Sequence, residues 1–224
     1  MNRDEVRRLA RESIARGDAV GWFDELYRRA GEKWDRIPWA DLVPNPYLVE
    51  WLDRFSVRGP GKPCLVVGCG LGDDAELLAE RGFDVVAYDI SATAIEGCRA
   101  RFPASKVEYV VADALEPPVD WIGRFALVFE SYTLQVLPPE PRSRALRAIA
   151  STVGPKGRLI VLCRAREKQD PEGELPWPLT RAELDTFGGQ GLTEVSVEDF
   201  LDRETPPVRR FLALYERGIA EAAG

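Results

Sequence analysis

Histidine is absent from this chain of 224 residues. Its absence excludes a serine–histidine–aspartate triad, a cysteine–histidine pair and every zinc site that needs an imidazole ligand. The four cysteines show no CxxC spacing, so neither a metal knuckle nor a redox pair is indicated. We therefore expect no bound metal ion, and we expect reduced thiols in a cytoplasmic protein.

Long apolar runs and a positive net charge are also missing. No stretch approaches the roughly 18 apolar residues that a membrane-spanning helix needs, and the first 17 residues lack the apolar core of a signal peptide. The formal net charge of −7 disfavours a protein that tracks nucleic-acid phosphates. Hydrophobic residues still make up 45% of the chain, which excludes disorder over most of its length. We expect a globular protein that binds neither nucleic acid nor membranes.

The first 60 residues are expected to be helical and rich in aromatic side chains. Apolar residues at helical spacing predict one helix near the start and a second that carries the aromatic stripe of residues 22–27. Asn45 followed by Pro46 predicts the start of a third helix, because asparagine caps helices and proline suits their first turn. We expect residues 1–60 to form a helical cap or lid on the domain of residues 61–224, not an independent domain.

From residue 62 onward, strands and helices alternate. We expect strands over residues 64–67, 83–88, 107–111, 125–129 and 158–163, with helices over residues 73–81, 91–101 and 139–153. Ser91 is the expected cap of the second of these helices. Such alternation predicts right-handed crossovers and a mostly parallel sheet with helices on both faces. Two late strand-like segments, residues 192–200 and 208–215, suggest an antiparallel edge. The predicted fold is a doubly wound, Rossmann-like α/β sheet of seven strands with an antiparallel last strand.

Glycines and acids follow the carboxyl ends of the predicted strands, where open parallel sheets bind their ligands. The first strand runs into GCGLG at residues 68–72, whose glycines let the backbone turn sharply and approach a ligand. Asp89 follows the second strand, 21 positions beyond the first glycine, where an acid can accept hydrogen bonds from both hydroxyls of a ribose. Asp113 follows the third strand and Glu130 the fourth. This combination predicts a ligand that contains a nucleoside.

The spacing of the glycines narrows the choice of ligand. A dinucleotide-binding turn carries GxGxxG and presents a helix N-terminus to a pyrophosphate. Here the spacing is GxGxG, and the next helix opens with Asp73 and Asp74. Two carboxylates at this position repel a pyrophosphate and favour a cationic amine or a sulfonium. The pattern therefore disfavours NAD and FAD and favours S-adenosylmethionine.

The stretch from about residue 62 to 163 resembles the class I S-adenosylmethionine-dependent methyltransferases. The motifs that carry the resemblance are LVVGCGLGDDAELLAERGFDVVAYDIS, VVADAL and FALVFESYTLQVLPPEPR. The resemblance implies S-adenosyl-L-methionine as the cofactor, S-adenosyl-L-homocysteine as the product and no metal ion. The residues expected at the cofactor are Gly68, Cys69, Gly70, Gly72, Asp73, Asp89, Ile90, Ala112, Asp113, Ala114 and Glu130. Many members carry an acid where this chain has Val66, and Asp73 or Asp74 is expected to compensate for it.

Within that superfamily, the front of the chain is similar to the thiopurine S-methyltransferase-like branch, which includes the tellurite-resistance methyltransferases. The stretch WDRIPWADLVPNPYLVEWL is similar to a segment in which a tryptophan covers the cofactor, and Trp39 is the matching position. An arginine beyond the fourth strand in that branch maps approximately onto Arg142, which implies contact with an anionic acceptor. The branch places a sulfur acceptor slightly ahead of oxygen or nitrogen but does not fix it.

Methyl transfer from a sulfonium is an in-line displacement, and its barrier falls mainly through alignment and desolvation. A thiol acceptor needs the least help because part of it is ionised at neutral pH, whereas a phenol or an amine benefits from a base. Without histidine, the candidate bases are Glu130, Asp41 and Tyr132.

Trp34 and Trp39 lie in a loop broken by prolines, where we expect them to act as an aromatic lid over a flat, apolar acceptor. The residues expected at the acceptor are Trp34, Trp39, Tyr27, Tyr132 and Arg142. We therefore predict an enzyme that methylates sulfur, oxygen or nitrogen of a small aromatic or apolar molecule. Two alternatives stay open: the same fold carries out another reaction on the cofactor, such as cyclisation or aminopropyl transfer, or it binds the cofactor without catalysis. The sequence does not indicate an oligomeric state.

Overall fold

The computed structural model describes residues 1–31 and 33–219. The chain forms two compact units, one of Met1–Asp113 and one that begins at Ala114. Within the described residues, the strands follow the order β3-β2-β1-β4-β5-β7-β6 in a seven-stranded sheet. The predicted Rossmann-like sheet is therefore confirmed. The expected boundary near residue 60 falls inside the first unit, and the separate lid stays a prediction.

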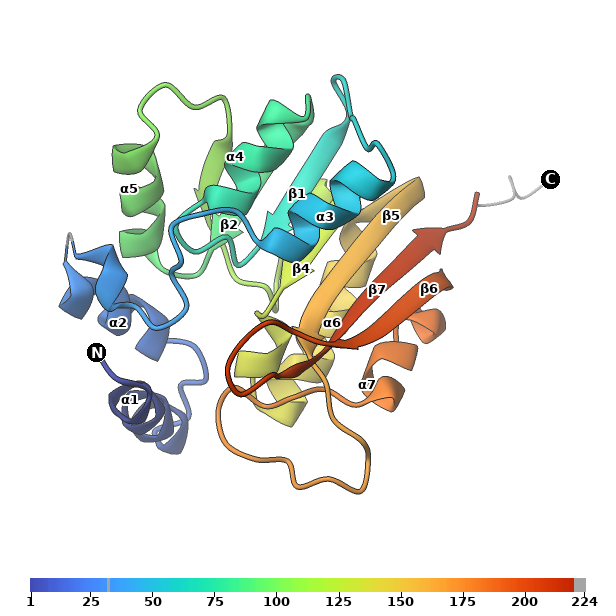
Figure 1. Cartoon of the computed structure of the whole chain (residues 1–224). Coiled ribbons are helices and arrows are strands. Elements are labelled where there is room, and N and C mark those ends of the chain that lie inside the picture. The colour runs from blue at the N-terminus through green and yellow to red at the C-terminus, as the bar shows by residue number, and fades with distance from the viewer. Residues whose placement is uncertain (32, 220–224) are drawn as a thin grey trace. The chain divides into compact units, whose positions relative to one another are not determined.

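The first unit contains the three strands that lead to the glycine turn and its neighbours. In chain order its elements are α1 (Arg3–Ala15), α2 (Trp22–Ala30), η1 (Trp34–Arg36), α3 (Pro46–Arg54), β1 (Pro63–Val67), α4 (Asp73–Glu80), β2 (Asp84–Asp89), α5 (Ala92–Arg101) and β3 (Glu108–Val111) (Figure 1). The pairs β1–β2 and β2–β3 are parallel. Nearly every residue of β1 and β2 is buried, which explains why both strands have continuous apolar sequences.

Helices in the first unit begin where the sequence predicts capping residues. Helix α3 starts after Asn45, whose side chain accepts a hydrogen bond from the Tyr47 N–H at 3.0 Å. Helix α5 starts after Ser91, whose hydroxyl accepts a hydrogen bond from the Ala94 N–H at 3.0 Å. Both contacts satisfy N–H groups that have no partner within the helix.

The second unit begins after β3 and carries the antiparallel part of the sheet. Its elements are η2 (Val119–Trp121), β4 (Phe125–Ser131), η3 (Leu134–Val136), α6 (Pro139–Thr152), β5 (Val153–Arg164), α7 (Arg181–Asp185), η4 (Gly188–Gln190), β6 (Leu192–Leu201) and β7 (Arg209–Arg217). Strand β4 is parallel to β5, and β7 lies antiparallel between β5 and β6 (Figure 1). The antiparallel last strand is confirmed.

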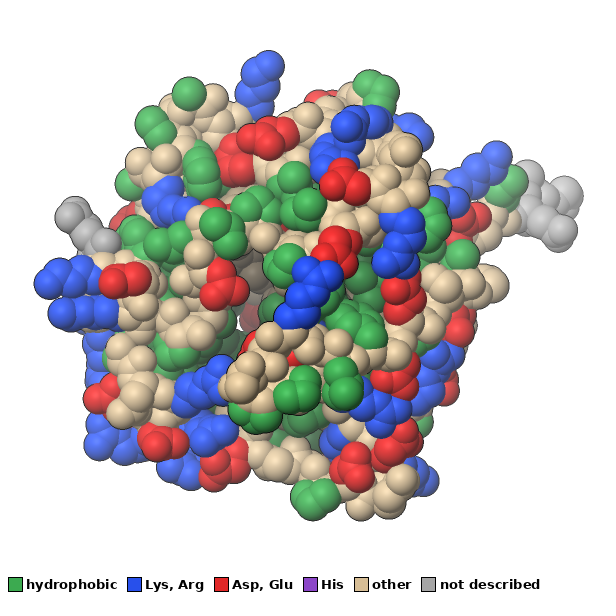
Figure 2. All heavy atoms as spheres, in the orientation of Figure 1, with side chains coloured by type: hydrophobic (Ala, Val, Ile, Leu, Met, Phe, Trp, Pro, Cys, Tyr) green, Lys and Arg blue, Asp and Glu red, His purple; other side chains and the backbone are tan. Residues whose placement is uncertain are grey.

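Charges of both signs alternate on the surface drawn in Figure 2. Among the described residues, close pairs of opposite charge include Arg29 with Glu25 at 2.7 Å and Arg209 with Asp199 at 2.5 Å. Neighbouring opposite charges limit the potential that a surface presents to a charged partner. In the described part of the chain, no helix combines the length and the apolar character that a membrane crossing requires.

Candidate active site

The segment between β1 and α4 turns through three glycines with left-handed backbone. Gly68, Gly70 and Gly72 have φ angles of 57°, 53° and 89°, which side chains with a Cβ rarely adopt. Space is limited as well. A Cβ on Gly72 would lie 2.5 Å from the Tyr109 hydroxyl, and one on Gly70 would lie 3.2 Å from the Tyr27 hydroxyl. The local structure therefore requires glycine in this turn.

Asp89 holds the glycine turn from the end of β2. Its carboxylate accepts hydrogen bonds from the Gly70 N–H at 3.0 Å and from the Ser91 N–H at 2.9 Å. Burial raises the pKa of Asp89 to about 6, although backbone N–H groups oppose the shift. The main-chain oxygen of Asp89 also accepts a hydrogen bond from the Ala112 N–H at 3.1 Å. The structure thus brings together the glycine turn, Asp89, which is the acid expected at the ribose, and the loop after β3.

Tyr27 and Trp39 place aromatic side chains beside this turn. The indole N–H of Trp39 donates a hydrogen bond to the Tyr27 hydroxyl, which is the same hydroxyl that approaches Gly70. Tyr27 is buried, and burial together with the charge of Asp89 raises its pKa well above the usual range. Trp39 is 41% exposed and packs edge-to-face on Trp22, with ring centroids 6.2 Å apart. Two of the residues expected at the acceptor therefore lie next to the glycine turn.

The other two candidates from the same loop lie in different surroundings. The ring of Trp34 packs on α5 at Gly97, where an added Cβ would lie 3.0 Å from a ring carbon. Trp34 is half-buried in this packing contact, and its contact with an acceptor stays a prediction. Asp41 is exposed, and a role as base stays a prediction for it too.

Both acids that open α4 already have partners. Asp73 forms a bidentate ion pair with Arg101, at 2.7 and 2.8 Å, and Arg101 also donates to the main-chain oxygen of Leu71. Asp74 accepts a hydrogen bond from the Asn45 N–H at 2.7 Å, and burial raises its pKa to about 6. A guanidinium therefore offsets the negative charge that was expected to attract a cationic headgroup, and the contact of Asp73 with the cofactor stays a prediction.

Asp24 is a residue of this region that the sequence does not reveal. Its carboxylate accepts hydrogen bonds from the Ser91 hydroxyl at 2.8 Å and from the Thr93 N–H at 3.1 Å. Burial alone would raise the pKa of Asp24, but these hydrogen bonds lower it below its usual value. The contact ties α2 to the start of α5, directly after Asp89. The sequence near Asp24 does not predict this contact, because Ser91 and Thr93 lie 67 and 69 positions away in the chain.

The remaining residues expected at the cofactor lie at or beyond strand ends. Ile90 is half-buried after β2, Asp113 is half-buried after β3, and Ala114 begins the second unit. Cys69 lies within the glycine turn, and its thiol contacts that of Cys98 on α5. Within residues 1–31 and 33–219, no group of three or more cysteine, aspartate or glutamate side chains is arranged to hold a metal ion.

Glu130 is a fully buried acid near the end of β4 in the second unit. Its Oε1 atom accepts hydrogen bonds from the Thr133 N–H at 2.8 Å and the Leu134 N–H at 3.0 Å. Its Oε2 atom has no hydrogen-bond partner among residues 1–31 and 33–219. Burial raises the pKa of Glu130 to about 7, against the effect of the two N–H groups. Such a carboxylate is suited to take up a proton near neutral pH.

Tyr132 follows Glu130 closely and is fixed by a cation on β7. Its φ angle of 63° is left-handed, and its N–H donates a hydrogen bond to the Leu162 oxygen at 3.0 Å. The guanidinium of Arg210 lies 4.9 Å from the ring centroid of Tyr132. Asp202 and Glu204 hold that guanidinium at 2.6 and 2.5 Å. The second unit therefore orients this ring through a cation–π contact.

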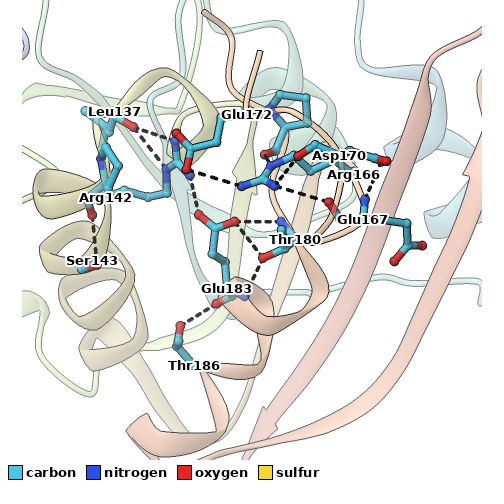
Figure 3. A network of polar contacts seen from close by, with 12 residues as sticks. Leu137, Arg142, Ser143, Arg166, Glu167, Asp170, Glu172, Thr180, Glu183 and Thr186 are labelled. Carbon is cyan, nitrogen blue, oxygen red and sulfur yellow. Dashed lines mark hydrogen bonds and ion pairs between the residues drawn. The ribbon is translucent and has the colours of Figure 1, made fainter. Parts of the chain in front are cut away.

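Arg142 is buried inside the second unit. Two of its nitrogens donate hydrogen bonds to the Leu137 oxygen at 3.1 and 3.0 Å, and a third pairs with Glu183. Glu183 in turn accepts hydrogen bonds from the Thr180 N–H at 2.8 Å and its hydroxyl at 2.9 Å. Figure 3 shows Arg142 and Glu183 pointing toward each other, with Arg166 nearby. These bonds use three of the five N–H donors of Arg142 inside the second unit, and its contact with an anionic acceptor stays a prediction.

The glycine turn and Asp89 fit the adenosyl part of S-adenosylmethionine. A carboxylate has about four lone-pair sites, and the Gly70, Ser91 and Ile90 N–H groups all act on Asp89. At least one acceptor position therefore remains for a ribose hydroxyl. With its pKa near 6, the carboxylate is mostly ionised at neutral pH and accepts such hydrogen bonds strongly.

Comparison with known proteins agrees with this fit. A family model described as a methyltransferase domain matches residues 64–157. The chain is 30% identical over 169 residues to the 2-heptyl-1-hydroxyquinolin-4(1H)-one methyltransferase of Mycobacteroides abscessus, with 72% of each chain covered. It is 27% identical over 163 residues to the probable thiol methyltransferase 2 of Arabidopsis thaliana, which covers 72% of this chain and 67% of that protein.

A solved structure from the study "Conversion of a Disulfide Bond into a Thioacetal Group during Echinomycin Biosynthesis" shares the fold. Its TM-score is 0.72 at 23% identity, covering 90% of this chain and 92% of that chain. The sheet order, the glycine turn held by a buried acid and the curated relatives all lead to one conclusion. The chain belongs to the class I S-adenosylmethionine-dependent methyltransferases.

Proposed function

We propose that this enzyme transfers a methyl group to sulfur, oxygen or nitrogen of a small molecule with an aromatic or apolar body. The observation that carries the proposal is the pair Tyr27 and Trp39 beside the glycine turn. Tyr27 approaches Gly70 and holds the Trp39 indole, which leaves 41% of Trp39 exposed. An exposed indole in that place offers a flat apolar surface to an acceptor and helps to exclude water.

The relatives support the same class of acceptor. A hydroxyquinolone with a heptyl chain is flat and apolar, and the plant relative is named for thiols. Both acceptors suit an in-line displacement that depends on alignment rather than on a metal ion. We keep sulfur slightly ahead of oxygen and nitrogen, as the branch resemblance implies. In the second unit, Tyr132 is the acceptor-binding residue that we retain, because a cation–π contact holds its ring in one orientation.

A screen of thiols, phenols and amines with methyl-labelled S-adenosylmethionine tests the proposal. Labelled product from an aromatic or apolar acceptor is the expected result. Cofactor that is consumed without labelled methyl product would indicate a different reaction, and cofactor binding without any turnover would indicate a non-catalytic protein. Mass spectrometry of the products separates these outcomes.

Replacement of Trp39 by alanine tests the aromatic surface itself. Loss of an aromatic contact of about 1.5–3 kcal/mol predicts a fall in kcat/KM of about 10- to 150-fold. The dissociation constant for S-adenosylhomocysteine should change by less than about threefold. Phe55→Ala is the matched control, because Phe55 is 56% exposed at the end of α3 and packs on Trp51 with its ring tilted by 52°. Equal losses in both variants, or a large fall in the melting temperature of Trp39→Ala, would contradict the proposal.

The cellular setting belongs to the same proposal. The four cysteines, Cys64, Cys69, Cys98 and Cys163, are all free thiols, which supports a reducing compartment such as the cytoplasm. The expectation that the enzyme acts on a small molecule and not on nucleic acid stays part of the proposal as well.

A further inference from the structure

We infer that Glu130 takes the proton from the methyl acceptor, and that the acceptor carries a weakly acidic hydrogen on the atom that is methylated. Thiols, phenols and N-hydroxy compounds fit this description, whereas acceptors that are already anions do not need it. The inference rests on the proposed function and narrows its substrate class. It depends on one geometric fact: Glu130 is fully buried, with one carboxylate oxygen fixed by the backbone and the other without a partner in the described part of the chain.

A structural role accounts for only half of this side chain. The Oε1 atom of Glu130 satisfies the N–H groups of Thr133 and Leu134 at the start of η3. A glutamine would accept the same two hydrogen bonds through its carbonyl oxygen and would bury no charge. A carboxylate whose second oxygen finds no donor carries a desolvation cost that the fold does not offset. The Oε2 atom gains a hydrogen-bond partner if a bound acceptor donates its hydrogen to it.

The surroundings leave the carboxylate able to exchange a proton. The shift in the pKa of Glu130 comes from burial and from the N–H groups at η3, so no cation fixes it in the ionised form. Cys163 on β5 is close enough to feel its charge, and burial together with the charge of Glu130 raises the pKa of that thiol. Arg210 on β7 and Glu183 on α7 act on the same thiol with opposite signs. Cys163 therefore stays protonated, and Glu130 is the group of this cluster that changes its charge near pH 7.

The chemistry balances with one proton acceptor. Bound S-adenosylmethionine supplies a sulfonium methyl, so that the acceptor atom bonds to the methyl carbon while the carbon–sulfur bond breaks and its electron pair stays on sulfur. The hydrogen of the acceptor atom passes as a proton to Oε2 of Glu130. The carboxylic acid then returns this proton to water after the product leaves. An acceptor that is already an anion has no such proton, so its rate should not depend on Glu130.

A series of para-substituted thiophenols and aliphatic thiols tests this dependence directly. Glu130→Gln keeps the shape and the two backbone hydrogen bonds but cannot take up the proton. We expect it to slow methylation of weakly acidic alkyl thiols by about 100-fold or more at pH 7. para-Nitrothiophenol, which is ionised at that pH, should lose less than about threefold. Glu140→Gln, at an exposed site in the first turn of α6, is the matched control and should leave both rates unchanged.

A readout that needs no turnover checks the protonation itself. The infrared difference between the wild-type protein and Glu130→Gln should contain a carboxylic acid band that titrates near pH 7, because subtraction removes the bands of Asp74 and Asp89, whose pKa values are about 6. Should this variant not fold, the wild-type pH–rate profile with an alkyl thiol decides. The rate should fall below about pH 7 and level off above it, whereas without a base on the enzyme it would keep rising toward the thiol's own pKa of about 8.5.

The outcomes separate the inference from the proposed function. If S-adenosylhomocysteine binds but no thiol, phenol or N-hydroxy compound is methylated, the proposed function fails. If acceptors are methylated and Glu130→Gln slows all of them equally, or none, the role of Glu130 as proton acceptor is overturned. The same follows if no carboxylic acid band titrates near pH 7.

Discussion

Replacement of Asp89 by asparagine tests the contact on which cofactor binding depends. The carboxylate accepts hydrogen bonds from the Gly70 and Ser91 N–H groups, and it has at least one acceptor position left for a ribose hydroxyl. Asparagine offers one oxygen in place of two, so its amide group replaces an acceptor with a donor. A hydrogen bond to a charged group contributes about 1.5–3 kcal/mol, so the loss of one such bond to the cofactor should weaken binding about 10- to 150-fold.

The pH dependence of binding gives a second signature of Asp89. Burial raises its pKa to about 6 in the free protein, and ribose hydroxyls donate best to the ionised form. Affinity for the cofactor should therefore be constant above about pH 7 and should fall as the pH drops below 6. This acidic decline should be much smaller in Asp89→Asn, because the amide does not titrate.

Calorimetry with S-adenosylhomocysteine between pH 5 and pH 8 measures both effects. Asp84→Asn is the matched control, since Asp84 is the exposed first residue of the same strand and makes the same change of charge. An unchanged dissociation constant in Asp89→Asn at pH 8 would refute the ribose contact. An equal loss in Asp84→Asn would show that net charge, and not the contact, governs the affinity.

Two further substitutions in the second unit follow from burial. Arg142→Met should lower the free energy of unfolding by about 2–3 kcal/mol, because the Leu137 oxygen and the half-buried Glu183 carboxylate lose their charged donor. Arg144→Met, at an exposed ion pair of the same helix, should cost at most about 1 kcal/mol. Urea denaturation with equal losses in the two variants would contradict this. Glu130→Gln should stabilise the protein by about 3 kcal/mol at pH 8 but not at pH 4. The pKa of Glu130 is raised in the folded state, so its contribution to stability is fully present below about pH 4.5 and is lost as the pH rises through 7. Denaturation curves that shift equally at both pH values would refute the burial of this charge.

Local signals explain which parts of the fold the sequence predicts. Asn45-Pro46 and Ser91 begin α3 and α5 as expected, because a capping residue acts within a few positions of its own place in the chain. Strand β5 was expected from residue 158 but begins at Val153. Its first residues include glycine and proline, which favour a turn, yet pairing with β4 carries the strand through an irregularity at which Lys156 has a φ angle of 58°. A ladder formed with a distant segment outweighs a local turn preference.

The same distinction applies to the site. The glycine turn and Asp89 are predicted because they follow strands whose apolar runs are visible in the sequence. The partners of Asp24 and Arg101 lie far away in the chain, so neither contact has a local signature. The loop position of Trp34 predicts a lid, which stays a prediction, but it does not predict that the indole packs against α5 where Gly97 carries no side chain. This packing depends on how the loop and α5 meet in the fold, and the spacing of residues within either segment does not predict it.

Acid should affect cofactor binding and folding in opposite directions. Burial raises the pKa values of Asp74 and Asp89 to about 6, so the folded protein binds these protons more readily than the unfolded chain does. Their contribution to stability is therefore fully present below about pH 4 and is lost as the pH rises through 6, which means that acidification from pH 8 to pH 5 adds stability through these groups. The hydrogen bonds that lower the pKa of Asp24 keep its contact with α5 ionised in this range. Binding that needs the ionised form of Asp89 weakens over the same interval. Urea denaturation should show that the free energy of unfolding stays constant or rises from pH 8 to pH 5, while calorimetry on the same preparation shows that the affinity for the cofactor falls. A fall in both quantities would mean that contacts in the folded protein favour the charged forms of Asp74 and Asp89.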